Sequence, residues 1–409
     1  MNVCGFSRVN YWQGIKGGME LHGKFLSEGL VSKGHQVTLL STKHPHSKKF
    51  EEKNGVKIIN LINTVFGSRR KGWSKESVKK FLELHENIPF DVIWSQSYDA
   101  YGLTLLKKNS LRIPVITILH GCAEQEIKTF IVNFFIRLRK PNKIIKSMLG
   151  LIFFYSFIQR KFLNFSDKII TVSQEVSESI RKIYGTKIAE KCFTVVNGVD
   201  TSIFKNETDQ RIALRKKYKI SKNDILLLTI GRITHEKGYH LAINALLHLK
   251  NQKINTKLMI VGKGEYLDQL KKEVKRKQLE KDVIFCGFIE NDETVAYYNC
   301  ADVILNPTLT SEGLSYVLLE AMACGKPVVA SKIGGVNSII KNCENGLLFD
   351  AGNSSQMAAN IKLIINNPLL AEKISFSARK TILQNFSIET TIKNTLSIIS
   401  KSAQKTLKK

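Results

Sequence analysis

The segment Ile225-Leu226-Leu227-Leu228-Thr229-Ile230-Gly231-Arg232 decides the fold class. Its first six residues are almost all apolar and do not alternate with polar residues, so both faces of the strand they form are expected to be buried. Strands of this kind belong to parallel sheets that are covered by helices on both sides. The glycine and the arginine that follow end the strand at the edge where parallel sheets bind ligands.

Similar strands recur along the chain and alternate with amphipathic segments such as Tyr239–Lys250. This alternation predicts a doubly wound α/β architecture. The first series of expected strands is Val3–Phe6, Gln36–Leu40, Asp91–Ser95, Val115–Leu119, Lys168–Val172 and Phe193–Val196. The second is Ile225–Ile230, Lys257–Val261, Val283–Phe285, Val303–Asn306, Val328–Ala330 and Leu347–Phe349.

The two series predict two Rossmann-like domains that face each other across a cleft. A chain of 409 residues exceeds what one hydrophobic core usually holds. The domains are expected at residues 1–198 and 199–385, with a linker in the polar stretch Thr201–Asp224. Residues 386–409 are expected to add a helix, Ile388–Ile399, and a basic tail that is frayed from Lys401.

The composition is that of a globular protein, with 43% hydrophobic and 24% charged residues, but the net charge is +27. This charge reflects either lysine-rich solvated surfaces or attraction to an anionic partner. Zinc-finger spacing and aromatic RNA-binding motifs are missing from the sequence, so no nucleic acid partner is expected.

Cysteine spacing and apolar runs predict the compartment. The seven cysteines form no C-x-x-C pair and are expected to be buried, reduced thiols. The first residues do not resemble a signal peptide, and the longest apolar run, Met148–Ile158, is about half the ~20 residues that span a bilayer. We therefore expect a cytoplasmic protein, and a peripheral position on the inner face of the cell membrane would follow only if residues 126–165 dock on lipid.

Polar residues follow several of the expected strands, at the edge where phosphates bind to helix N-termini. Each of these loops has a simpler interpretation as well. Gly17-Gly18 also fits a tight turn, His120 a structural histidine, and the cations Arg232 and Lys237 a solvated loop. The sequence Gly262-x-Gly264 lacks the third glycine of a dinucleotide site, because Leu267 stands in its place.

Glu312 and Glu320 are the most informative pair. On one helix they would lie about 12 Å apart along the axis, beyond the spacing of about 5–9.5 Å that glycosidase carboxylates use. They are therefore expected to bind different parts of one long ligand. The amides of Gly313, Leu314 and Ser315 lie between them in sequence and suit phosphate oxygens. A nucleotide diphosphate sugar has this layout.

The stretch from Glu312 to Ala330 resembles the E-x7-E signature of retaining, GT-B fold glycosyltransferases of family 4. The likeness covers nearly the whole chain. Leu314, Ser315 and Asn337 differ from the residues that are commoner in that family, which bears on the choice of sugar. The other matching loops are Gly17-Gly18, His120, Asn197-Gly198-Val199-Asp200, Gly231-Arg232, Glu236-Lys237-Gly238, Gly334-Gly335 and Asn345-Gly346-Leu347.

The resemblance implies roles for individual residues. Glu312 is expected to hold the donor sugar and Glu320 the ribose. Arg232 and Lys237 are expected to hold the diphosphate, while His120 contacts the sugar near the reacting centre. The expected catalytic residues are thus His120, Arg232, Lys237 and Glu312. The expected donor-binding residues are Gly17, Gly18, Gly262, Gly264, Gly313, Leu314, Ser315 and Glu320.

The resemblance also implies a reaction. A hexose is expected to pass, with retention, from a UDP- or GDP-sugar on the second domain to a glycan or lipid-linked acceptor on the first. The setting would be the synthesis of cell-surface polysaccharide or lipopolysaccharide. The sequence has no D-x-D triplet, so neither a metal nor another cofactor is expected. Two alternatives stay open: a non-catalytic nucleotide-sugar or glycan-binding protein, and another GT-B enzyme, such as an inverting transferase or an epimerase.

An insert rich in phenylalanine and basic residues, residues 126–165, lies between His120 and the strand at Lys168. One interpretation is a pair of core helices with basic outer faces. The other is a surface that docks on an anionic membrane, where each Lys or Arg contributes about 1 kcal/mol.

Overall fold

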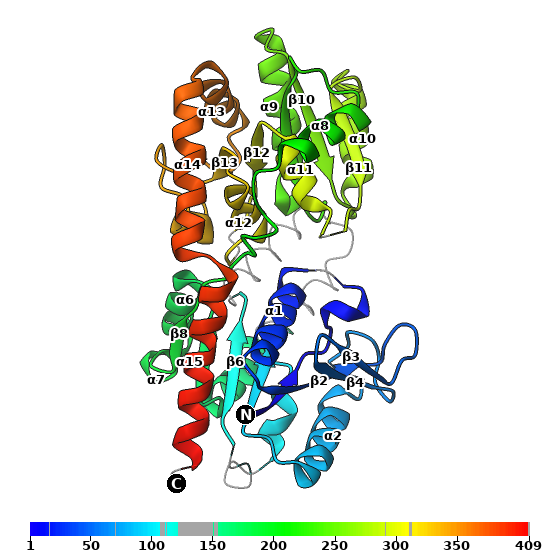
Figure 1. The fold of residues 1–409 in the computed structure, drawn as a ribbon, viewed down its shortest axis with the longest axis vertical. Helices are drawn as coiled ribbons and strands as arrows, with labels where there is room; N and C mark the ends of the chain where they lie inside the picture. Colours follow the sequence, from blue (N-terminus) through cyan, green and yellow to red (C-terminus); the bar gives the residue numbers. More distant parts are fainter. Residues whose placement is uncertain are drawn as a thin grey trace. The chain divides into compact units, whose positions relative to one another are not determined.

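The computed structural model describes residues 1–15, 17–69, 71–106, 111, 113–121, 150, 154–290, 292–310 and 313–407. The chain forms two compact units, each built on its own sheet (Figure 1). The first contains the described residues up to Asn197 and returns at Glu389, and the second contains Gly198–Ile388. The predicted α/β fold class is confirmed, with two mostly parallel sheets and a helix after the second.

The first unit has an eight-stranded sheet in the order β3-β4-β2-β1-β5-β6-β7-β8. Neighbouring strands are parallel except β3 and β4. The strands are β1 (Asn2–Phe6), β2 (Gln36–Thr42), β3 (Phe50–Lys53), β4 (Val56–Leu61), β5 (Val92–Gln96), β6 (Val115–Leu119), β7 (Lys168–Thr171) and β8 (Cys192–Thr194). The longer helices are α1 (Gly18–Ser32), α2 (Trp73–Asn87), α5 (Arg160–Phe165) and α6 (Gln174–Tyr184).

The hairpin of β3 and β4 is an addition that we did not predict. Its turn is Asn54-Gly55, and both residues have positive φ, 50° and 78°. Lys53 pairs with Val56 across it. This is the two-residue turn that Asn-Gly favours, because both central positions need a left-handed backbone. The hairpin places Phe50 at the edge of the sheet, opposite Ile59.

The second unit has a six-stranded parallel sheet in the order β11-β10-β9-β12-β13-β14. The strands are β9 (Ile225–Ile230), β10 (Thr256–Val261), β11 (Val283–Gly287), β12 (Val303–Asn306), β13 (Val328–Ser331) and β14 (Leu347–Phe349). The helices are α8 (Thr208–Lys217), α9 (Tyr239–Asn251), α10 (Leu267–Arg276), α11 (Thr294–Cys300), α12 (Tyr316–Ala323), α13 (Ser354–Asn366) and α14 (Pro368–Asn385). Leu226, Leu227 and Leu228 are fully buried, as the non-alternating pattern predicts.

The last helix, α15 (Ile388–Leu407), packs on the first unit after the chain has completed the second. Ile399 is fully buried in the same core cluster as Val3 and Leu30, and Thr391 donates a hydrogen bond to the carbonyl oxygen of Val196. The expectation that the chain frays from Lys401 is wrong, because the helix continues to Leu407 and buries Ala403.

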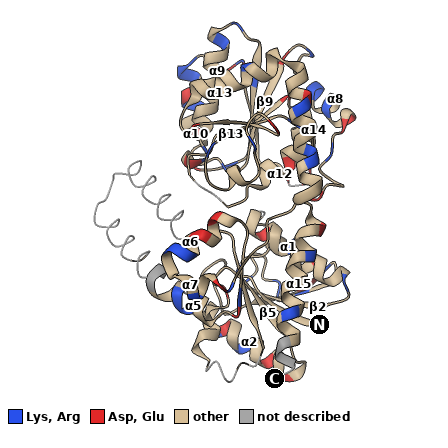
Figure 2. Ribbon diagram, turned by 90° about the vertical axis from the view of Figure 1, so that its left-hand side faces the viewer, with Lys and Arg blue, Asp and Glu red and all other residues tan. Residues whose placement is uncertain are grey.

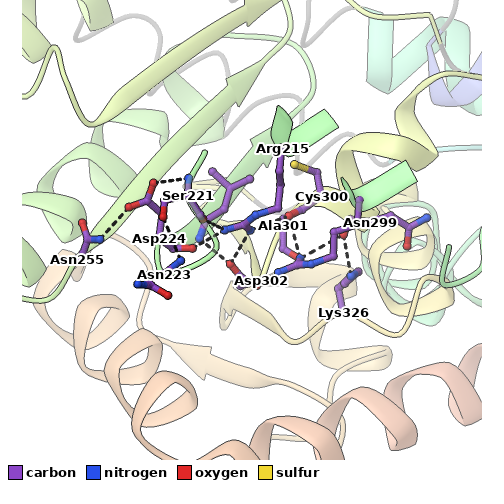
Figure 3. A network of polar contacts seen from close by, with 12 residues as sticks. Arg215, Ser221, Asn223, Asp224, Asn255, Asn299, Cys300, Ala301, Asp302 and Lys326 are labelled. Carbon is purple, nitrogen blue, oxygen red and sulfur yellow. Dashed lines mark hydrogen bonds and ion pairs between the residues drawn. The ribbon is translucent and has the colours of Figure 1, made fainter. Parts of the chain in front are cut away.

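The stretch expected to be a linker, Thr201–Asp224, instead contains α8, which is fixed to the second unit (Figure 3). Arg215 is almost buried and donates hydrogen bonds to Asp302 and to the carbonyl oxygens of Cys300, Ser221 and Asp224. Three carbonyl groups at the end of α11 also accept from Arg211. These cations satisfy the carbonyl groups that a helix C-terminus leaves unpaired.

Lys326 joins this network at the end of α11. Its Nζ donates to the carbonyl oxygen of Asn299 at 2.9 Å. Burial lowers the pKa of Lys326 to about 8. The charged sequence of α8 suggested a solvated segment, because the acceptors that its arginines reach on α11 and at Asp302 lie more than 80 residues away in the chain.

Other expectations can be compared with the described residues. Cys4, Cys300 and Cys324 are buried free thiols, whereas Cys343 is exposed, contrary to expectation. Within the described ranges, no helix is long and apolar enough to cross a membrane. Residues 126–149 and 151–153 of the insert lie outside the described residues, so neither interpretation of it is tested there.

Candidate active site

The loop after β9 carries two of the expected catalytic cations. Arg232 is exposed, and its guanidinium makes no hydrogen bond or ion pair with any described residue. Lys237 ends the short 3-10 helix η5 (His235–Lys237) and is half-buried. Both residues follow the carboxyl end of a central strand, where an anion can reach them.

Two histidines line the same loop but add no positive charge at neutral pH. The rings of His235 and His240 stack with centroids 4.8 Å apart. Burial lowers the pKa of His240 to about 4, and it lowers that of His235 as well. The positive charge of this loop therefore comes from Arg232 and Lys237.

The glycines around these cations allow three loops to touch. Gly238 has a φ of +69°, and a Cβ atom there would lie 1.9 Å from the carbonyl oxygen of Pro307. Cβ atoms on Gly262 and Gly264 would lie 1.8 Å and 2.0 Å from the carbonyl oxygens of Gly231 and Ile233. Gly262 and Gly264 thus hold the loop after β10 against the loop after β9. Their expected contact with a donor stays a prediction.

The segment after β12, which precedes the acidic motif, is tied to the same loops. The backbone N–H of Leu309 donates to the carbonyl oxygen of Glu236 at 2.7 Å, which ties the segment after β12 to η5. Glu312 itself lies outside the described residues. Gly313 and Ser315 are half-buried, whereas the side chain of Leu314 is buried. Ser315 is the N-cap of α12, and its side chain caps no backbone N–H.

Glu320 lies on α12 and is half-buried. Its Oε2 accepts a hydrogen bond of 2.6 Å from the hydroxyl of Tyr298 on α11. Burial raises the pKa of Glu320 to about 7, although the hydrogen bond from Tyr298 favours the charged form. A second hydroxyl, that of Tyr316, is buried without a hydrogen-bond partner among the described residues. A carboxylate in this setting can accept hydrogen bonds from ligand hydroxyls.

In the first unit, His120 directly follows β6, and Gln96 ends the adjacent strand β5. The amide nitrogen of Gln96 lies 2.6 Å from the carbonyl oxygen of Met19 and 2.9 Å from Nε2 of His120. Because a carbonyl oxygen can only accept, the nitrogen of the Gln96 amide is the atom that faces both groups. Nε2 of His120 is then the acceptor, and its proton resides on Nδ1.

His120 is held neutral by its surroundings. Burial lowers its pKa well below the usual value, and the neighbouring His22 lowers it further. The two rings meet edge to face, with centroids 4.8 Å apart. Burial also lowers the pKa of His22, to about 4. His120 therefore presents a neutral ring with an Nδ1–H donor, which suits a hydroxyl or a carbonyl ligand.

The expected donor-binding pair Gly17-Gly18 opens α1, with Gly17 as its N-cap. The carboxylate of Glu20 folds back over this end and accepts hydrogen bonds from the backbone of Gly17 and of Glu20 itself. A Cβ atom on Gly17 would lie 2.4 Å from Oε2 of Glu20. The helix end is thus already capped by its own carboxylate, and the predicted contact of these glycines with a donor is not tested.

Gln96, His22 and Tyr298 are site residues that the sequence reasoning missed. Gln96 had a usable signal, because it is a polar residue at the end of a fully buried strand, like His120. His22 and Tyr298 lie inside helices, where a single polar residue gives no comparable signal. Across the described part of the chain, no three His, Cys, Asp or Glu side chains are grouped as a metal site.

Two family models match the chain, one for each half. The model described as glycosyltransferase family 4 matches residues 16–203, and that described as glycosyl transferases group 1 matches residues 210–381. MJ1607 of Methanocaldococcus jannaschii, named an uncharacterized glycosyltransferase, is 26% identical over 389 residues, which is 94% of each chain. The alpha-monoglucosyldiacylglycerol synthase of Streptococcus pneumoniae is 26% identical over 352 residues, 85% of this chain and 75% of its own.

Solved structures show the same fold. The structure of Anabaena HepE in complex with UDP and glucose has a TM-score of 0.77 and 21% identity, and the match covers 98% of this chain and 100% of that one. Both family models, the relatives along the whole chain and this structural match agree with the resemblance seen in the sequence. The amino-terminal half matches the family 4 model, and the carboxyl-terminal half matches the group 1 model. The chain therefore belongs to the family 4, group 1 glycosyltransferases and has the GT-B fold.

Proposed function

We propose that this enzyme transfers a hexose, with retention of configuration, from a nucleotide diphosphate sugar to a glycan or lipid-linked acceptor. The observation that carries the proposal is the link between the cationic loop and the acidic motif. The hydrogen bond from Leu309 to Glu236 ties the loop that carries Lys237 to the segment after β12, and Glu320 follows on α12 in the same unit. Such a site has positive charge for a diphosphate and a carboxylate for sugar or ribose hydroxyls.

The relatives support this donor class. HepE was solved with UDP and glucose, and the name of the pneumococcal relative describes a glucosylated lipid product. By analogy, we propose a UDP- or GDP-sugar as the donor. We also propose a glycan or lipid-linked acceptor and a role in the synthesis of cell-surface polysaccharide or lipopolysaccharide. The lipid product in the name of the pneumococcal relative supports a lipid-linked acceptor.

The chemistry requires charge stabilisation on two sides. As the bond between the sugar C1 and the phosphate oxygen breaks, negative charge grows on the diphosphate and positive charge on the sugar ring. Arg232, Lys237 and the amides before α12 would stabilise the leaving group, so we propose that no metal is needed. The neutral His120 would donate a hydrogen bond to the sugar without adding positive charge beside the ring.

Product stereochemistry tests the proposal. Proton NMR of the first product from an α-linked UDP- or GDP-sugar should show the α anomer, and added EDTA should leave the rate unchanged. A thermal-shift screen of UDP, GDP and their sugars should identify the donor first, because a bound ligand stabilises the native state. A β product would indicate an inverting enzyme, and an epimerised donor an epimerase. Donor binding without transfer or hydrolysis would indicate a non-catalytic binding protein.

A further inference from the structure

A basic and apolar surface lies on the first unit, apart from the insert at residues 126–165. It consists of the exposed side chains of residues 43–50, from the end of β2 to the first residue of β3, and of residues 62–69, 71 and 72, between β4 and α2. Neither segment contains an Asp or a Glu, but Lys48 pairs with Glu51, the residue after Phe50, and Arg69 pairs with Asp99. We call it the basic-apolar surface.

Four large apolar side chains are exposed there. The exposed fractions are 56% for Phe50, 51% for Ile62, 47% for Val65 and 37% for Phe66. Single exposed apolar residues are ordinary on proteins, but a group of them in two adjoining loops marks an interaction surface. Lysines accompany them, and Lys43, Lys49 and Lys71 are exposed without an ion pair to any described residue.

Hydrogen bonds hold the two segments together as one surface. The N–H of Lys43 donates to Oγ1 of Thr64 at 2.8 Å, and the N–H of Gly67 donates to Oγ1 of Thr42 at 3.0 Å. The N–H of Asn60 donates to the carbonyl oxygen of Lys49 at 2.8 Å. The apolar side chains are thus presented by a hydrogen-bonded framework.

The basic-apolar surface lies at the carboxyl-end edge of the first sheet. Strands β2 and β4 run parallel to β6, so their carboxyl ends lie at the edge of the sheet where His120 follows β6. Basic residues are spread over helices of both units (Figure 2), so charge alone does not single out a surface. The combination of exposed apolar side chains with three lysines that pair with no described carboxylate does.

We propose that the basic-apolar surface docks the enzyme on an anionic lipid bilayer. Lysines attract the headgroups, and phenylalanine, isoleucine and valine enter the boundary between headgroups and acyl chains. A nucleic acid would use the lysines but would gain little from Ile62 and Val65. The inference goes beyond sugar transfer, because vesicle binding and transfer are separate measurements.

Vesicle co-sedimentation of the full chain tests the proposal. The wild type should bind vesicles that contain about one third phosphatidylglycerol and should bind pure phosphatidylcholine far less, with binding weakened by high salt. Each lysine near an anionic surface is worth about a fivefold change in affinity. The Lys43→Gln/Lys49→Gln/Lys71→Gln variant should therefore bind on the order of 100-fold more weakly.

A matched control separates the surface from the net charge. The Lys271→Gln/Lys272→Gln/Lys373→Gln variant makes the same change of charge at exposed positions of α10 and α14 and should bind like the wild type. Likewise, Val65→Ser/Phe66→Ser should weaken binding at least tenfold. Phe376→Ser, at an exposed phenylalanine of α14, should not change it.

Several outcomes would overturn the proposal. A wild type that ignores anionic vesicles would do so, and so would equal losses in the surface and control variants. Full binding by the surface variants would move the docking site elsewhere, with residues 126–165 as the next candidate. A loss in the lysine variant alone would indicate a polyanion site rather than a bilayer. Donor hydrolysis without vesicles should stay at the wild-type rate in every variant, which keeps this test independent of the proposed transfer reaction.

Discussion

Tyr298 donates a hydrogen bond of 2.6 Å to Glu320, yet burial still raises the pKa of this carboxyl to about 7. A carboxyl group with a raised pKa destabilises the native state at neutral pH when it ionises. Such groups are found more often at ligand sites than at purely structural positions. The hydroxyl groups of a bound ribose would supply the hydrogen bonds that the charged form lacks. If Glu320 binds the ribose, stability and nucleotide binding should respond to pH in opposite directions.

Glu320→Gln should remove a pH-dependent destabilisation. The folded-state pKa lies above the ordinary value of 4.5, so the native state holds this proton more tightly than the unfolded chain does. The free energy of unfolding should therefore fall as pH rises from about 4.5 to about 7, by up to about 3 kcal/mol. Urea unfolding at pH 5 and pH 8 should show this loss in the wild type and a smaller loss in Glu320→Gln. Glu280→Gln, at an exposed position, serves as the control.

Nucleotide affinity should show the opposite trend. If Glu320 binds ribose hydroxyls as a carboxylate, UDP or GDP should bind more tightly as pH rises through about 7. Isothermal titration calorimetry across this range would measure the change. If the nucleotide affinity of Glu320→Gln had the same pH dependence as that of the wild type, the proposed ribose contact of Glu320 would be contradicted.

Gln96→Glu should change the protonation of His120. A carboxylate cannot donate to Nε2, so the ring would carry its proton there, and the added negative charge would raise its pKa. Transfer should slow by about tenfold and gain a pH dependence near neutrality. Nitrogen-15 NMR of the histidine rings should show Nδ1 protonated in the wild type. A wild-type spectrum and rate in the variant would refute this role for Gln96.

Arg232→Ala and Lys237→Ala should each lower turnover by about 10²–10³, because each removes a preorganised contact to the leaving group. Steady-state kinetics with the identified donor would measure the loss, and circular dichroism would check that the variants fold. Lys222→Ala, at an exposed lysine of the same unit, should retain full activity. Near-normal rates in both loop variants would rule out the diphosphate role.

Arg215→Met should destabilise the second unit far more than Arg211→Met. Arg215 is almost buried and donates to Asp302 and to three carbonyl groups, so its loss leaves one oxygen of Asp302 and these carbonyl groups without this buried donor. The cost should be about 3 kcal/mol. Arg211 is about one third exposed and should cost less than about 1 kcal/mol. Urea unfolding of the two variants would measure the difference, and equal losses would contradict the model of a buried cation network.

The sheets could be predicted because buried parallel strands are apolar on both faces. Leu226, Leu227 and Leu228 have this pattern, and β9 is where it predicts a strand. The hairpin of β3 was missed although Asn54-Gly55 is a specific turn signal, because β3 itself is short, charged and at an edge.

The site could be predicted loop by loop but not contact by contact. His120 and Arg232 could be predicted because each follows the carboxyl end of a strand. In a parallel sheet these ends lie at the edge where ligands bind. The partners of these residues depend on tertiary packing. Gln96 reaches His120 from the neighbouring strand, and Tyr298 reaches Glu320 from the preceding helix. No spacing rule relates such pairs.

The return of α15 to the first unit also has a consequence for biosynthesis. Ile399 fills the core beside Val3 and Leu30, so the amino-terminal unit lacks part of its interior until the segment after Ile388 has left the ribosome. Domains usually fold in the order in which they are made. Here the second unit can finish first, and chains stalled before residue 389 would hold the earlier unit with an uncovered apolar face for chaperones to bind.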